Sequence, residues 1–477
     1  MKKGFRTFQP NANAWDTKLY FPTPLPFLEE WRTNIAAAQQ EFANLTIKER
    51  AAFLHDLATE LLAAKDDIQV LYCQESGLPK KRFEAEFERT FHTIRLFADY
   101  LEKARWEKTE TLEQEKIKLI KRNIPIGPVL VLGSSNFPLA YSTLGGDTVA
   151  AFSAGCCVVL KAHPMHVGTS SLVATCISKA LDKRQLSPYI FSHVLDDSYH
   201  WASTFAKEPA IKAIGFTGSI KGGRALMDIA AQRPDPIPVF AEMGSLNPVI
   251  INENLDAAAL TQAAEKLALS IYTDAGQFCT KPGLILVHEQ QLASFLDQLS
   301  TALELQQPVP MLHPDIFAKY EARKRQVFQV KGMKRHESLA PIQGIEARWA
   351  LAETTLQNLS AAEAAQEEVF GPFAVLCSYQ ELSACTALLQ KLGGQLTATV
   401  FAEDLTAIDP SLLFKLQTQA GRLIFNGVPT GVRVLETMHH GGPYPASSDA
   451  RFSAVGPDSI RRFTKEVCFE GTLNDLD

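Results

Sequence analysis

The 477-residue sequence lacks the patterns that mark several classes of protein. No apolar run reaches the roughly 18 residues that a membrane span needs. The N-terminal MKKGFRTFQPNANAWDT has no apolar stretch behind its two lysines, so no secretory signal is predicted. The eight cysteines form no CxxC pair and the eleven histidines lack ligand spacing. We therefore expect a cytoplasmic protein without a membrane span, a disulfide scaffold or a metal centre.

The sequence also lacks a strong excess of charge. Its 47 lysines and arginines against 53 aspartates and glutamates give a net charge of -6. This balance disfavours nucleic-acid partners, which bind basic patches. The basic run Lys116–Asn123 alternates with apolar residues, so it predicts a strand with one polar face. The length corresponds to about three domains.

Strands and helices alternate through most of the chain. Leu28 to about Leu101 shows apolar residues at helical spacing, and a strand is predicted at Ile117–Arg122. Short apolar runs such as PVLVLG, CCVVLK and LILVHE then alternate with predicted helices, among them residues 141–155 and 256–276. Later strands are predicted at Val369–Tyr379, Leu396–Phe401 and Arg422–Asn426. This order is typical of a doubly wound α/β fold with parallel sheets.

A glycine-rich turn, GFTGSIKGG at Gly215–Gly223, joins a predicted strand to a helix. Glycines let a backbone approach a phosphate, and a helix N-terminus offers free N–H groups. Gly218, Ser219 and Gly223 are the candidate phosphate contacts. The motif is not the common G-x-G-x-x-G fingerprint, and an ordinary turn explains it equally well.

Two residues are candidates for covalent chemistry. Cys279, in AGQFCTKPG, lies in a loop after a long helix, where a thiol can be an accessible nucleophile or merely a half-buried cysteine. Glu242, in FAEMGS, ends an apolar strand. A carboxylate there suits a general base, although an ordinary edge-strand acid fits the same pattern.

Together these stretches closely resemble the aldehyde dehydrogenase superfamily over nearly the full chain. Seven motifs occur in the family's order, and this agreement outweighs the simpler interpretations of each one: GSSNFPL, VVLKAHP, GFTGS, FAEMGSLNP, AGQFC, EEVFGPF and FNGVPTG. The resemblance implies that Cys279 is the nucleophile and Glu242 the base that activates water. It implies that the Asn136 amide and the Cys279 N–H stabilise the oxyanion.

The same resemblance assigns cofactor contacts. Lys161 matches the lysine on the adenosine ribose, Ser219 a pyrophosphate contact, Glu368 the carboxylate on the nicotinamide ribose, and Phe370 the ring beside the nicotinamide. Many NAD-preferring relatives have a glutamate three positions after the lysine, whereas Lys161 is followed by Ala-His-Pro. Since no carboxylate repels a 2′-phosphate there, NADP is the predicted cofactor, with NAD possible and His163 a candidate phosphate contact or a plain loop residue.

The chain resembles one subgroup of this family in particular, in the stretches SNFPLAYSTLGGDT, KAHPMHVGTS, FAEMGSLNPV, GQFCTKPG and MHHGGPYPAS. That subgroup holds 2,5-dioxopentanoate (α-ketoglutarate semialdehyde) dehydrogenases and an NADP-preferring fatty aldehyde dehydrogenase. His440, in HHGGPYP, matches a histidine near the catalytic cysteine of that subgroup, or packs in its loop without a role. The semialdehyde is the favoured substrate and needs a cationic anchor, for which Arg451 is the candidate. A long-chain aldehyde, which needs an apolar tunnel, is the alternative.

The family's architecture predicts three parts. A cofactor domain spans residues 1–110 and 128–242, a catalytic domain spans 243–450, and an oligomerisation element spans 111–127 and 451–477. The C-terminal RRFTKEVCFEGTL alternates enough to pair as a strand, which predicts a homodimer or homotetramer. A non-catalytic relative would tend to lack Cys279 or Glu242, and CoA-acylating or acyl-phosphate enzymes do not need Glu242.

Overall fold

A helical layer forms the N-terminal part of the computed structural model, which describes residues 4–103, 110–114 and 117–472. The helical spacing predicted from Leu28 to Leu101 is confirmed by α1 (Pro26–Ala43), α2 (Ile47–Ala63), α3 (Lys65–Ser76) and α4 (Lys80–Glu102). The second of these helices begins with a capping box, because Thr46 and Glu49 satisfy each other's backbone N–H groups.

A five-stranded parallel sheet follows, in the order β7-β6-β5-β8-β9. Its strands are β5 (Val129–Leu132), β6 (Val158–Lys161), β7 (Phe191–Val194), β8 (Ala213–Thr217) and β9 (Val239–Glu242), joined by α5 (Gly146–Ala154), α6 (Val167–Lys183), α7 (His200–Lys207) and α8 (Ile220–Ala231). The chain winds outward from β5 through β6 to β7 and then returns to β8. Doubly wound sheets bind ligands at such a switch point, beyond the carboxyl ends of their strands.

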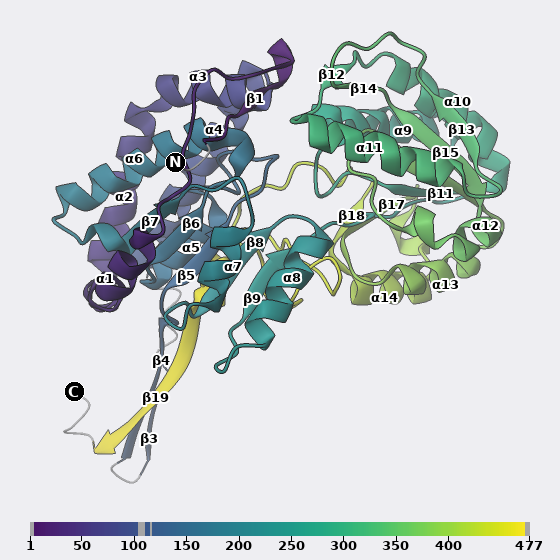
Figure 1. The fold of residues 1–477 in the computed structure, drawn as a ribbon. Helices are drawn as coiled ribbons and strands as arrows, with labels where there is room; N and C mark the ends of the chain where they lie inside the picture. The colour runs from purple at the N-terminus through teal and green to yellow at the C-terminus, as the bar shows by residue number, and fades with distance from the viewer. Residues whose placement is uncertain (1–3, 104–109, 115–116, 473–477) are drawn as a thin grey trace.

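A larger sheet forms the second lobe in Figure 1, in the order β13-β15-β16-β11-β10-β17-β18. All neighbouring strands are parallel except β13, which runs antiparallel to β15. The strands are β10 (Val249–Ile251), β11 (Leu284–His288), β13 (Lys334–Glu337), β15 (Ala350–Thr355), β16 (Phe373–Tyr379), β17 (Gln395–Phe401) and β18 (Ala420–Phe425). The helices are α9 (Ala257–Tyr272), α10 (Glu289–Glu304), α11 (Pro314–Phe328), α12 (Leu356–Ala361), α13 (Leu382–Leu392) and α14 (Pro410–Gln419). These two sheets confirm the predicted doubly wound α/β fold.

An antiparallel arm projects from the first lobe (Figure 1) and contains β3 (Glu110–Gln114), β4 (Ile117–Pro125) and β19 (Thr464–Thr472). Of the C-terminal tail predicted to pair, Thr464–Thr472 pairs with β4 of the same chain, whereas Arg461–Phe463 ends a 3-10 helix. The last tail residue predicted to pair, Leu473, lies outside the described residues. The remaining strands form two small antiparallel sheets of two strands each: β1 (Phe8–Gln9) with β2 (Ala14–Trp15), and β12 (Val309–Pro310) with β14 (Glu346–Ala347). The predicted domain bounds stay a prediction.

Several element boundaries differ from the sequence prediction, and three have a clear cause. The helix expected over residues 141–155 begins only at Gly146, because the preceding residues turn back on the loop after β5, where Ser134 N donates to Tyr141 O at 2.9 Å. The long helix expected to reach Gly276 ends at Tyr272. The strand expected from Val369 begins at Phe373, because Gly371 has a positive φ of 153°.

The segment between β18 and β19 crosses back to the first lobe and runs along β9. Met243 N donates to Ala446 O at 2.8 Å, and Ser448 N donates to Ala241 O at 3.0 Å. This return path carries His440 to the carboxyl end of β9, where Glu242 lies. In the described part of the chain, no helix is long and apolar enough to cross a membrane.

Candidate active site

The loop that carries Cys279 is held in an unusual backbone conformation. Asp274, Ala275 and Gly276 follow α9 with φ values of 51°, 52° and 65°. Left-handed conformations cost non-glycine residues ~1–3 kcal/mol, so surrounding contacts must fix them. Asp274 accepts a hydrogen bond from Arg82 Nε at 2.6 Å, and a Cβ on Gly276 would lie 2.4 Å from the carbonyl of Gly371. The turn therefore requires glycine at 276 and an arginine from α4.

Glu242, Cys279 and His440, here called the central triad, meet at the carboxyl end of β9. His440 Nε2 lies 3.0 Å from a Glu242 carboxylate oxygen and 3.8 Å from the Cys279 sulfur. The Cys279 sulfur also lies within 4.8 Å of a Glu242 carboxylate oxygen. Glu242 and His440 are buried, whereas Cys279 is half-buried. The sequence predicted all three residues individually, and the fold brings them into contact.

Electrostatics within the triad favour a neutral thiol beside an ionised carboxylate. Burial raises the pKa of Cys279 well above its usual value, and the nearby Glu242 carboxylate raises it further. Burial alone would also raise the pKa of Glu242, but its contacts with His440 and Cys279 hold that pKa below the ordinary value. In the free protein the proton therefore stays on the Cys279 thiol, beside an ionised carboxylate that can accept it when a substrate draws on the sulfur.

Asn136 lies beside the nucleophile loop, as predicted. Its amide donates to Gln277 O at 2.7 Å, two residues before Cys279. The loop after β5 that carries it is anchored by Glu86 of α4, which accepts from Leu139 N at 2.8 Å and Ala140 N at 2.9 Å. An amide fixed in this way can donate to an oxygen that develops charge next to Cys279.

The predicted phosphate contacts lie at the switch point of the five-stranded sheet. Ser219 is the exposed N-cap of α8 and accepts from Gly222 N at 3.2 Å. Close packing explains two glycines here, because a Cβ on Gly218 would lie 2.6 Å from the Phe216 ring and one on Gly223 2.5 Å from Met243. The helix N-terminus that they form is a suitable place for an anion.

Lys161 and His163 follow β6 on the same edge of the sheet. Lys161 Nζ donates to Asp196 O at 2.7 Å, and burial lowers the pKa of Lys161 to about 8. His163 Nδ1 accepts from Met165 N at 3.3 Å, and its ring stacks on His166. Burial, together with the neighbouring His166 and Lys161, lowers the pKa of His163 well below its usual value. His163 is therefore neutral near pH 7 in this structure.

Glu368 and Phe370 lie in the loop before β16. A Cβ on Gly244 would lie within contact distance of the Glu368 carboxylate, so only glycine admits this acid beside the end of β9. Burial raises the pKa of Glu368, and the buried Lys281 opposes that rise. Phe370 is half-buried. The carboxylate also contributes to the raised Cys279 pKa, which places it near the nucleophile.

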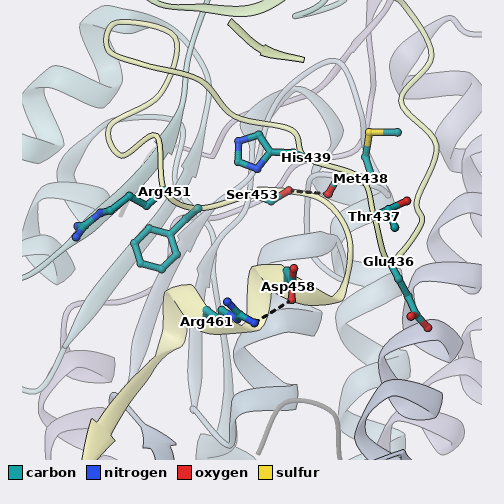
Figure 2. Close-up of a pocket in the computed structure, with 9 residues that line it drawn as sticks. Glu436, Thr437, Met438, His439, Arg451, Ser453, Asp458 and Arg461 are labelled. Atoms are coloured by element: carbon teal, nitrogen blue, oxygen red, sulfur yellow. Dashed lines mark hydrogen bonds and ion pairs between the residues drawn. The ribbon is translucent and has the colours of Figure 1, made fainter. Parts of the chain in front are cut away.

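Arg451 lies away from the central triad. Its guanidinium is 80% exposed and paired with Asp449 at 2.6 Å. Figure 2 shows it at the edge of a cavity of about 150 Å³, pointing away from His439. The charges of this cavity are already paired, since Arg461 contacts Asp458 at 3.6 Å. The role of Arg451 as a substrate anchor stays a prediction. In the described residues, no contact between Arg451 and Cys279 supports it.

Sequence reasoning missed several side chains around the nucleophile. Tyr141 contacts His440, with ring centroids 6.4 Å apart, and accepts a hydrogen bond from Arg89. Lys281 lies beside Glu368, and Arg422 lies near Cys279. Arg422 could have been singled out from the sequence, because it is a charged residue inside the apolar strand AGRLIF. Arg89 is one of many charged residues on α4, and no local pattern distinguishes it.

Comparison with known proteins agrees with this geometry. Residues 28–465 match the aldehyde dehydrogenase family. The α-ketoglutaric semialdehyde dehydrogenase of Acinetobacter baylyi is 37% identical, and the match covers 98% of this chain and 91% of the relative. The α-ketoglutaric semialdehyde dehydrogenase 2 of Azospirillum brasilense is also 37% identical, over 90% of this chain and 83% of the relative.

Solved structures share the fold at low sequence identity. The 1-pyrroline-5-carboxylate dehydrogenase from Thermus with bound NAD has a TM-score of 0.86 at 17% identity, and the match covers 99% of this chain and 91% of that one. Proline utilization A from Bdellovibrio bacteriovorus has a TM-score of 0.87 at 19% identity. This chain, matched over 99% of its length, spans 49% of that longer protein.

Proposed function

The chain belongs to the aldehyde dehydrogenase family, and from this premise we propose that it oxidises 2,5-dioxopentanoate to 2-oxoglutarate with a nicotinamide cofactor. The contact between Cys279, Glu242 and His440 carries the proposal, because it supplies a thiol nucleophile and a base in one buried site. The substrate follows from the two relatives at 37% identity, whose names specify this semialdehyde.

We propose that the central triad acts twice in the reaction. Glu242 takes the Cys279 proton, and the thiolate adds to the aldehyde carbon. The Asn136 amide and the Cys279 backbone N–H stabilise the resulting oxyanion, where losing one donor typically costs ~10²–10³ in rate. A bound nicotinamide would supply the acceptor for the hydride that leaves that carbon. Glu242 releases the thiol proton to solvent and then acts as the base that activates water to hydrolyse the thioester, and His440 favours its ionised form.

The residues at the switch point fit a nicotinamide dinucleotide. The exposed N-terminus of α8 offers N–H groups for the pyrophosphate, with Ser219 and the glycines at 218 and 223 beside it. Lys161 Nζ donates one hydrogen bond to the Asp196 carbonyl, so its remaining N–H groups can donate to a ribose hydroxyl. Glu368 and Phe370 are the proposed contacts at the nicotinamide end.

We propose a preference for NADP over NAD, since the chain has Pro164 and no carboxylate in the loop after Lys161. His163, neutral in the free protein, would gain a proton when a 2′-phosphate binds beside it. The contribution of His163 to NADP binding is therefore present below the pKa that His163 has in the complex, and it is lost as the pH rises through that pKa. The H163Q variant should lower the NADP-to-NAD ratio of kcat/KM at pH 6 more than at pH 8, and an unchanged ratio would exclude His163.

Initial rates test the main proposal. Wild-type protein should oxidise 2,5-dioxopentanoate faster than a long-chain aldehyde such as dodecanal, and C279A should be inactive on both. E242Q should form reduced cofactor neither as a burst nor at a steady rate, because Glu242 is proposed as the base in both acylation and hydrolysis. Turnover of the long-chain aldehyde alone would make the fatty aldehyde the substrate, while oxidation that survives in C279A would refute the thioester route.

We further propose that the chain forms a homodimer or homotetramer in the cytoplasm through its projecting arm. The edges of the arm are β3 and β19, on which Leu112 and Phe469 are exposed. Exposed apolar residues on an open sheet edge favour pairing with another chain. Light scattering should give twice or four times the mass of 52.6 kDa, and a monomer would refute the assembly.

A further inference from the structure

Two arginines beside the central triad have no carboxylate partner among the described residues. Arg89, on α4, donates to the Tyr141 hydroxyl at 2.7 Å and lies over that ring, 5.0 Å from its centroid. Arg422, on β18, donates to the Pro429 carbonyl, and its buried Nε has no hydrogen-bond partner in the described structure. A half-buried guanidinium with donors left over is costly unless a ligand accepts them.

The two guanidinium groups approach Cys279 from opposite parts of the chain. On one side, Arg89 is linked through Tyr141 to His440, whose Nε2 lies 3.8 Å from the Cys279 sulfur. On the other side, Arg422 pairs in register with Thr397, which bonds to the side chain of Asn247 at 2.9 Å. The amide of that asparagine donates to the Cys279 carbonyl at 2.8 Å. Each arginine is thus connected to Cys279 through a short chain of contacts.

Charge interactions agree with this placement. Burial lowers the pKa of Arg422, and the nearby Cys279 and Tyr141 oppose that decrease. Arg89 in turn opposes the rise in the Cys279 pKa that burial causes. Other arginines of this region are already neutralised: Arg82 by Glu86 and Asp274, and Arg451 by Asp449. The free positive charge near the thiol therefore belongs to Arg89 and Arg422.

We propose that Arg89 and Arg422 bind the carboxylate of the substrate and so select a short aldehyde that carries an acid at its far end. The proposal rests on the proposed function, in which the aldehyde carbon of 2,5-dioxopentanoate is attacked by Cys279. Four C–C bonds of ~1.5 Å separate that carbon from the carboxylate, a span of roughly 5 Å when extended. Phe278, the residue before Cys279, packs edge to face against Phe137, with ring centroids 5.3 Å apart, and gives the nucleophile an apolar neighbour.

A comparison of two substrates of equal length tests the arginine pair. R89Q and R422Q are assayed with 2,5-dioxopentanoate and with pentanal, which has five carbons and no charge. A charge-assisted hydrogen bond corresponds to a factor of ~10–100 in binding. Each variant should therefore lower the ratio of kcat/KM for the acid to kcat/KM for pentanal by about that factor, mainly through the KM of the acid, because any effect on the Cys279 thiol is common to both substrates. R422K should recover part of the loss, since it keeps the charge but not the planar fork.

Three controls separate the outcomes. R325Q, an exposed arginine on α11, should behave as wild type on both substrates. R451Q should also keep its activity on the acid, and a selective loss there instead of in R89Q and R422Q would overturn the proposal. Calorimetry with the product 2-oxoglutarate, which needs no turnover, should show binding to wild type that is weakened in R89Q and R422Q.

The failure of this proposal is distinguishable from that of the proposed function. If wild type oxidises 2,5-dioxopentanoate well and both arginine variants lose acid and pentanal activity equally, the arginines are structural and the clamp is refuted. If wild type prefers pentanal to the acid, the proposed substrate and the clamp both fail. Circular dichroism and thermal melting of each variant exclude misfolding as the cause.

Discussion

Replacing His440 by phenylalanine tests how the catalytic carboxylate stays ionised in a buried site. Burial favours the protonated form of Glu242, yet its pKa lies below the ordinary value because His440 contacts it at 3.0 Å and the Cys279 thiol also lies close to it. Phenylalanine keeps most of the ring volume but removes the donor. The Glu242 pKa should then rise. As the pH is lowered, the carboxylate therefore becomes protonated at a higher pH than in wild type.

The size of the effect follows from the hydrogen bond that is removed. A hydrogen bond to a charged group contributes ~1.5–3 kcal/mol, and each ~1.4 kcal/mol is a factor of ten. On the acid limb of the pH profile, where protonation of Glu242 limits thioester hydrolysis, H440F should lower kcat by roughly 10- to 100-fold. In wild type, contact with His440 keeps the Glu242 pKa low, so activity persists at pH values above that pKa and decreases at pH values below it. Removing the partner moves this loss to higher pH.

Rapid-mixing measurements of reduced cofactor separate acylation, seen as a burst, from hydrolysis, seen as the steady rate. H440F should move the acid limb of the steady rate upward, whereas H440Q, which keeps an amide donor, should remain closer to wild type. An acid limb that H440F leaves in place would show that His440 does not set the ionisation of Glu242. Equal shifts in H440F and H440Q would mean that packing, not the hydrogen bond, matters.

Two further predictions concern the same region. R82M leaves the buried carboxylates of Glu86 and Asp274 without their cation, so it should destabilise the protein by ~3–5 kcal/mol, seen as a lower urea midpoint, and an unchanged midpoint would contradict this. The ligand atoms of the central triad all lie within 4.8 Å of one another, close to the spacing of a tetrahedral zinc site. Micromolar Zn²⁺ should therefore inhibit and EDTA restore activity, and equal sensitivity of wild type and H440F would exclude this site.

The sequence predicts best where function lies in short local motifs. Cys279 and Asn136 stand in stretches whose residue types and order match the family, and the doubly wound fold follows from the alternation of strands and helices. Element ends were less predictable: the helix expected from Tyr141 begins at Gly146 because tertiary hydrogen bonds hold the preceding turn. Local periodicity carries no information about such contacts.

The surroundings of the nucleophile were unpredictable for the same reason. Arg89 and Arg422 are more than 300 residues apart in sequence and lie on elements of different lobes, α4 and β18, yet both interact with the charge of Cys279. Arg451 was the sequence's candidate because it follows the motif that carries His440, but proximity along a loop does not fix the direction of a long side chain. Its guanidinium extends outward to Asp449 instead.

The buried network on α4 explains how this fold holds the reaction geometry. Glu86 accepts backbone N–H groups from the loop that carries Asn136, and Arg82 bonds both to Glu86 and to Asp274 in the strained turn before Cys279. The proposed oxyanion donor and the proposed nucleophile come from loops of different sheets, so neither sheet alone can set their separation. One helix that bonds to both loops does set it, at the cost of burying three charges that must be fully paired. Because α4 also carries Arg89, the same helix aligns the proposed carboxylate site with the thiol.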